Sequence, residues 1–223
     1  MIVTLKALSA LLTYPSADLQ AAAREIGPSL AAEGLLSPDR RAALEPLLAE
    51  LGACDLMDLQ ERFVLLFDRS RALSLNLFEH IHGESRARGQ AMVDLLETYR
   101  EGGFEPVGPE LPDHLPILLE FLSERPLDEA RDTLADAGHV IAVLGDRLEK
   151  RCSAYAAVLQ AAVALSTMTA PAELIAGLAA QPEDDPEDLA ALDAIWEESQ
   201  VTFGPDPNAG CPASREILSR MAS

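Results

Sequence analysis

The stretch that decides the fold is DLMDLQERFVLLF, residues 55–67. Its large apolar side chains recur at spacings of three and four residues, which places them on one face of an α-helix: Leu56, Leu59, Phe63, Leu66 and Phe67. Asp55 precedes them and is a favourable N-cap, while Glu61 and Arg62 face away. We therefore predict an amphipathic helix that packs its apolar face against other helices.

The same period recurs along the first three quarters of the chain. It predicts helices over 5–12, 19–26, 38–51, a stretch within 73–101, 114–123, 126–148 and 155–165. Proline and glycine separate them, as at Tyr14-Pro15-Ser16 and Gly102-Gly103. Residues 104–112 carry three prolines and predict an irregular connector, a possible hinge, after which Asp113 is expected to cap the next helix. The expected fold class is all-α, a single-domain helical bundle over residues 1–168.

Residues 169–223 differ in composition from the preceding part. Six prolines punctuate an acidic stretch, and only 189–197, with Trp196, has the pattern of a short amphipathic helix. We expect this acidic, proline-rich tail to be partly disordered.

Composition excludes several classes of protein. The 223 residues contain 17 basic and 37 acidic residues, a net charge of -20, which opposes binding to nucleic acid and favours a basic or amphipathic peptide partner. The three cysteines are widely spaced without a CxxC pair, so the sequence predicts neither a disulfide framework nor a cysteine-based metal site, and reducing cytoplasm fits best. Polar residues interrupt every apolar run, and the N-terminal segment lacks a clear cleavage motif, so no membrane insertion is expected.

Polar side chains are densest between residues 68 and 86 and around Asp113-His114. Three of the four histidines, His80, His82 and His114, could in principle bind a divalent metal with nearby carboxylates. However, His-x-His points two side chains about 200° apart on a helix, which disfavours a shared ion. The favoured alternative is an ion-pair network that caps helix ends and orients the histidines, formed by Glu79, Glu84, Arg69, Arg71 and Arg86. No nucleotide-binding or hydrolase motif occurs, so no catalytic residue and no cofactor are predicted.

Residues 61–123, ERFVLLFDRS through EFLS, closely resemble the NarJ family of respiratory nitrate reductase assembly chaperones. LLTYPSADL at 11–19 and ALDAIWEESQVTFG at 191–204 look like the opening and C-terminal segments of that family. The resemblance implies a TorD-like helical chaperone. Such a chaperone binds the apo catalytic subunit of nitrate reductase in the cytoplasm, partly through the subunit's N-terminal segment, while molybdenum cofactor and iron–sulfur clusters are inserted and before the complex docks at the membrane.

The resemblance is densest around the polar cluster and the connector, so we expect these to border a client-binding groove of the helix-in-groove kind. The candidate residues are Asp68, Arg69, Phe78, His80, His82, Glu84, Arg86, Asp113, His114, Leu115, Glu120 and Phe121. Three alternatives stay open: a chaperone for a related molybdoenzyme such as a selenate or chlorate reductase, a metal-dependent helical hydrolase, and a structural acidic scaffold.

Overall fold

The computed structural model describes residues 1–69, 71–83 and 85–167, and within these residues the chain is helical, which confirms the all-α prediction. The α-helices are α1 (Val3–Leu11), α2 (Ala17–Glu33), α3 (Pro38–Ala53), α4 (Leu56–Phe63), α5 (Leu77–His82), α6 (Arg86–Glu101), α7 (Leu115–Ser123), α8 (Leu127–Lys150) and α9 (Ala156–Leu165). A π-helical turn, η1 (Val64–Asp68), and a 3₁₀ turn, η2 (Arg71–Leu73), link α4 to α5. The predicted tail at 169–223, with its short helix at 189–197, lies outside the described residues. None of the described helices is long and apolar enough to cross a membrane.

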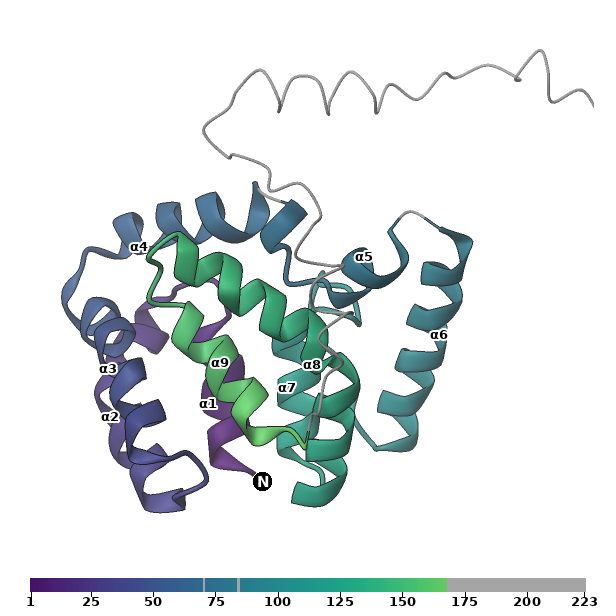
Figure 1. Cartoon of the computed structure of the whole chain (residues 1–223), viewed down its shortest axis with the longest axis horizontal. Helices are drawn as coiled ribbons and strands as arrows, with labels where there is room; N and C mark the ends of the chain where they lie inside the picture. Colours follow the sequence, from purple (N-terminus) through teal and green to yellow (C-terminus); the bar gives the residue numbers. More distant parts are fainter. Residues whose placement is uncertain (70, 84, 168–223) are drawn as a thin grey trace, which may run out of the picture. The chain divides into compact units, whose positions relative to one another are not determined.

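Helices α1 and α7 pair in antiparallel fashion at the centre of the described residues (Figure 1). The amide of Ile2 donates to the carbonyl of Ser123 at 2.6 Å, and the Ser9 hydroxyl donates to the carbonyl of Pro116 at 2.7 Å. The leucines of α1 are almost completely buried, as the three-and-four spacing predicts. This pair ties the N-terminus to the helix that follows the connector.

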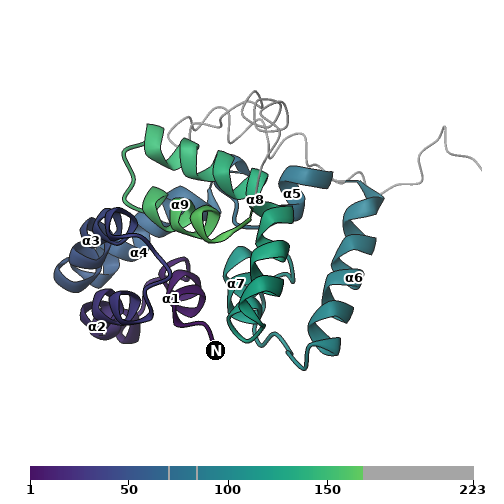
Figure 2. The ribbon, with the colours of Figure 1, turned by 60° about the horizontal axis from the view of Figure 1, so that its bottom comes forward.

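Two helical hairpins, α2–α3 and α8–α9, pack around α1 (Figure 2). Ser16 caps α2 and Ser37 caps α3 through their hydroxyls, and Pro38 occupies the first turn of α3 as predicted. At the far end of α2, the Glu33 carboxylate accepts hydrogen bonds from the amides of Val3 and Thr4, at 2.8 and 2.6 Å. One helix thus supplies the N-terminal cap of another.

The helix predicted over 56–67 keeps its α-helical hydrogen bonds only to Phe63, after which the chain widens into η1. Asp55 caps it as predicted, accepting from the amide of Met57 at 2.8 Å. Phe63 and Phe67 turn inward, with ring centroids 4.8 Å apart, and both meet Tyr155 edge-on. A π-helical turn inserts one residue into the helical ladder, and such turns are frequent at functional sites.

Helix α6 lies at the edge of the described helices in both views (Figures 1 and 2). Its C-terminal end is held by an aromatic cluster of Tyr99, Phe104 and Phe121, with ring centroids 4.8 to 5.7 Å apart. The Tyr99 hydroxyl also donates to the carbonyl of Pro112 at 2.8 Å. Tyr99 is the only fully buried side chain that α6 contributes within the described residues, and it holds the C-terminal end of the helix against α7.

Candidate functional site

Two segments far apart in the sequence meet where α5 begins and the connector ends. Asn76 and His114 form an isolated antiparallel β-bridge, with the amide of Leu77 donating to the carbonyl of Asp113 at 3.0 Å. The Asp113 carboxylate accepts from the amide of Phe78 at 2.9 Å. Asp113 therefore caps α5, and the prediction that it caps the following helix is wrong, because α7 begins after His114 without a side-chain cap.

The Asp113 carboxyl group is buried, and only one of its two oxygen atoms accepts a hydrogen bond. The residue is 1% exposed, and its Oδ1 atom has no hydrogen-bond partner in the structure, nor does the buried Oδ1 of neighbouring Asn76. Burial raises the pKa of Asp113, although the amide of Phe78 and the charge of Arg88 act in the opposite direction. Two buried acceptors without donors at one junction are uncommon, and a partner's N–H groups could reach them only if the connector moved.

The candidate histidines have separate environments. The His80 Nε2 atom lies 2.8 Å from the carbonyl oxygen of Ser74, to which it donates, and the His82 ring meets the Phe78 ring edge-on at 5.6 Å. Burial lowers the pKa of both His80 and His114, which favours neutral imidazoles at neutral pH. No group of three or more metal-binding side chains gathers among the described residues, so the hydrolase alternative finds no ligand set there.

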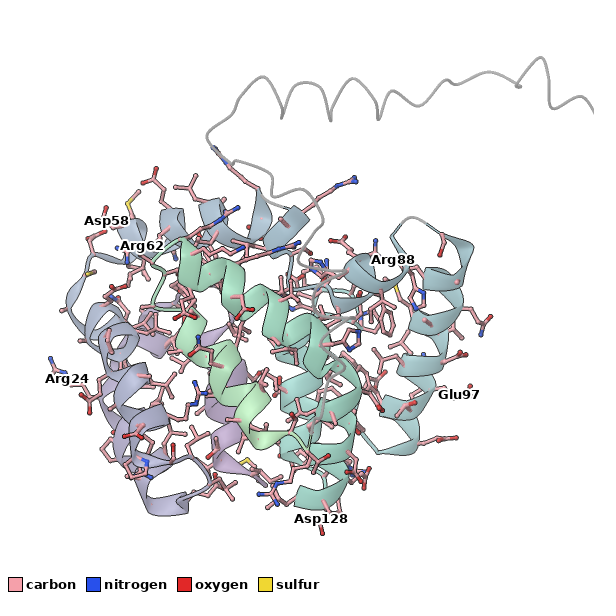
Figure 3. All side chains as sticks on the ribbon, in the orientation of Figure 1. Arg24, Asp58, Arg62, Arg88, Glu97 and Asp128 are labelled. Atoms are coloured by element: carbon pink, nitrogen blue, oxygen red, sulfur yellow. The ribbon has the colours of Figure 1, made fainter. Side chains whose placement is uncertain are left out.

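Glu79, one member of the predicted network, pairs with a residue that the prediction did not include. Glu79 pairs with Arg88 at 3.1 Å, linking α5 to the first turn of α6 beside the α5 helix in Figure 3. Sequence reasoning missed Arg88, and the i to i+9 spacing across a turn gives no helical pattern that would reveal it. Glu84 lies outside the described residues, as does the side chain of Arg86.

The structure gathers some of the predicted residues and separates others. Asp68 lies near Glu110 and His114. Burial and the negative charge of Glu110 raise the pKa of Asp68, and His114 acts in the opposite direction. Asp68 and Arg69 at the end of η1 thus belong to the same region as the α5 junction. Leu115 belongs to the junction through its backbone amide, which donates to the carbonyl of Leu75 at 2.9 Å, but its side chain is fully buried. The other two predicted residues lie elsewhere: Phe121 belongs to the aromatic cluster, and Glu120 pairs with Lys6 of α1. Neither apolar side chain is accessible in this structure.

The site accordingly consists of Asp68, Arg69, Phe78, His80, His82, Asp113 and His114, with Ser74, Asn76 and Arg88 as supporting residues. Asn76 occupies the N-cap position of α5, where asparagine is favoured, and this could have been read from the sequence. The side chains form a polar, partly buried surface without a nucleophile held by a base and an orienting group. Such an arrangement suits binding through hydrogen bonds and charge.

Comparison with known proteins gives consistent matches. Residues 33–161, which contain the whole candidate site, match the family described as nitrate reductase delta subunit. The nitrate reductase molybdenum cofactor assembly chaperone NarJ of Escherichia coli (strain K12) is 41% identical over 216 residues, covering 96% of this chain and 91% of that protein. The probable chaperone NarW of the same strain is 42% identical over 159 residues, covering 71% and 68%. The probable chaperone NarJ of Bacillus subtilis (strain 168) is 32% identical over 169 residues, covering 73% and 87%. These three relatives are named as assembly chaperones and not as catalysts.

Proposed function

The chain belongs to the nitrate reductase delta subunit family, and from this membership we propose that it is an assembly chaperone that binds the cofactor-free catalytic subunit of a nitrate reductase and permits insertion of the molybdenum cofactor. The observation that carries the proposal is the 41% identity to the NarJ chaperone across nearly the full length of both chains. The described residues form a helical bundle without a catalytic set of side chains, which agrees with binding as the activity.

We further propose that the client is held partly through its N-terminal segment, before iron–sulfur insertion is complete. The junction of α5 with the connector is the proposed contact region. Its support is the pair of buried acceptors on Asn76 and Asp113, together with the acidic Asp68 and Glu110 nearby. A basic segment with free N–H groups complements such a surface in both charge and hydrogen bonding.

Co-purification tests the proposed function. The chain would be expressed with the catalytic subunit in cells that make no molybdenum cofactor and, separately, in cells that do. We expect capture of the cofactor-free subunit and release of the mature one, with molybdenum in the reductase dropping sharply when the chain is deleted. Equal capture of both forms would favour an acidic scaffold, and unchanged molybdenum content would refute the proposal.

The choice of client needs its own comparison. A related molybdoenzyme subunit, of the selenate or chlorate reductase type, would be offered in parallel. Stronger capture of that subunit would assign the chain to the other client. For the contact region, calorimetric titration of a synthetic peptide from the client's N-terminus against wild type and Asp113→Ala is informative, because unchanged binding in a folded variant would remove the junction from the site.

A further inference from the structure

A hollow lies along α4 and η1. It has a volume of about 260 Å³, and its lining consists of Tyr14, Met57, Gln60, Glu61, Val64, Leu65 and Arg69. We infer that this hollow is a second client subsite, which takes an apolar side chain of the client while Glu61 meets a basic residue beside it. The inference rests on the proposed function and adds a binding surface to it.

The hollow follows from the π-helical turn. Residues 63–67 read FVLLF, five apolar residues in succession, which is more than one helical face can bury. The structure turns Phe63 and Phe67 inward against Tyr155, and Val64 and Leu65 consequently remain half-buried on the outside. The sequence thus places apolar side chains on a face that the described part of the chain does not cover.

The walls of the hollow are fixed by specific contacts. The Gln60 side chain donates to the carbonyl of Pro15 at 2.8 Å, which holds the turn between α1 and α2 against α4. In that turn the Tyr14 ring meets the Phe63 ring edge-on at 5.9 Å. A hollow with fixed walls loses little conformational entropy when it is filled. A cavity of about 150 Å³ holds a benzene molecule, so this one accommodates at least one large aliphatic or aromatic side chain.

The rim exposes apolar surface that a free protein would usually cover. Met57 is 77% exposed and Tyr14 is 51% exposed. An apolar patch with a polar rim is typical of a binding surface, and methionine adapts its shape to different partners. Both residues therefore favour a protein segment as the occupant.

Charge determines which kind of segment fits. Glu61 has no ion pair with any described residue, whereas adjacent Arg62 is paired with Glu50 at 2.6 Å. The whole chain carries a net charge of -20, so a second copy would approach against repulsion and a basic client segment would be attracted. The occupant is accordingly an apolar side chain presented by the client, with a lysine or arginine beside Glu61 and none beside Arg69, the cation that also lines the hollow.

The hollow also continues into the proposed contact region. Arg69 lines its far end, and Asp68 next to it interacts with His114 at the α5 junction. From Met57 to Arg69 the helical path is about 18 Å long, at roughly 1.5 Å per residue. A client segment of about twelve helical residues can therefore extend along the hollow from Met57 to Arg69.

The test uses two substitutions at the hollow, each with a matched control. Met57→Asp puts a charge into the apolar rim, and because residue 57 is in the first turn of α4 an acidic side chain there is compatible with the helix. Its control is Val93→Asp, on α6, where the valine is 56% exposed. Glu61→Lys is matched by Glu97→Lys on exposed α6, which changes the net charge equally; α4 and Glu97 lie on opposite sides in Figure 3.

Binding of the full-length chain to the immobilised cofactor-free catalytic subunit would be measured over a range of salt concentrations. We expect Met57→Asp to raise Kd about tenfold or more, and Glu61→Lys to raise Kd and flatten its salt dependence. Both controls should stay within about twofold of wild type. Urea unfolding midpoints would establish that all four variants are folded.

The possible outcomes distinguish an error in the proposed subsite from an error in the proposed function. If wild type captures the client and the hollow variants bind as well as their controls, the subsite is wrong and the proposed function stands. If wild type captures no client, both the subsite and the proposed function are refuted. If wild type instead shows a concentration-dependent mass that Met57→Asp abolishes, the hollow is a contact between copies, and the inference is overturned.

Discussion

Replacing Asp113 by asparagine should stabilise the protein at neutral pH. The carboxylate is almost completely buried, and its Oδ1 atom lacks a donor. An unsatisfied buried acceptor costs about 1–3 kcal/mol. Asparagine keeps the oxygen that accepts from the amide of Phe78 and removes the charge. Because the new amide N–H group itself needs an acceptor, we expect the lower end of that range, about 1 kcal/mol, or a Tm higher by about 2–4 °C.

The pH dependence gives the sharper test. Burial raises the folded-state pKa of Asp113 above the unfolded value of about 3.9, so the folded protein binds this proton more tightly than the unfolded chain. The penalty is therefore complete above the folded-state pKa and disappears as pH falls toward about 4. The advantage of Asp113→Asn should shrink in parallel. Asp113→Ala, which also removes the cap of α5, should be about 1 kcal/mol less stable than the asparagine variant.

Urea unfolding followed by far-UV circular dichroism, repeated from about pH 4 to pH 8, measures all three proteins under the same conditions. If Asp113→Asn were less stable than wild type by a constant amount at every pH, the ionised carboxylate would be a net stabilising cap. The assigned direction of its pKa shift would then be wrong.

Two further predictions concern the ends of α6 and α2. A Cβ atom at Gly102 would lie 2.6 Å from the Phe121 ring, so Gly102→Ala should destabilise by about 1–3 kcal/mol in thermal unfolding, whereas Gly89→Ala, with open space around it, should be neutral or stabilising by up to about 1 kcal/mol. Glu33→Gln should destabilise the protein by about 1 kcal/mol near neutral pH. Burial acts to raise the pKa of Glu33, but the hydrogen bonds from Thr4 and Val3 lower this pKa overall. The loss of stability should therefore vanish as pH falls through the folded-state pKa of Glu33. A loss of equal size at acidic pH would contradict this.

The sequence predicted the helical elements because their physical causes are local. Periodic leucines, Ser37 with Pro38, and the glycines after α6 act within a few residues. The π-helical turn was not predicted, since FVLLF satisfies an α-helical period and a wider turn equally well. The partner of Asp113 was also missed, because a capping carboxylate can serve any helix end that the fold brings near, and Phe78 is 35 residues away.

Periodicity also could not predict which apolar side chains are accessible at the surface. Leu115 and Phe121 were predicted as apolar contacts, yet α7 is surrounded by α1, α8 and the aromatic cluster, which bury both. Met57 of α4 and Val64 of η1 have the same apolar character but lie on a side that the described residues leave uncovered. A stretch with more apolar residues than one face can bury, such as 63–67, is the feature of this sequence that could have directed attention there.

The buried charge of Asp113 and the exposed rim of the hollow have a common physical meaning. Each lowers the stability of the isolated chain, one by desolvating a carboxylate and the other by leaving apolar area in water. A client that displaces the connector, brings N–H groups to the first and places an apolar side chain in the second would reverse both effects on binding. The free energy that these two features cost the isolated chain would then contribute to its affinity for the cofactor-free client. A variant that gains stability at residue 113 and loses affinity for the client is the result that this exchange requires.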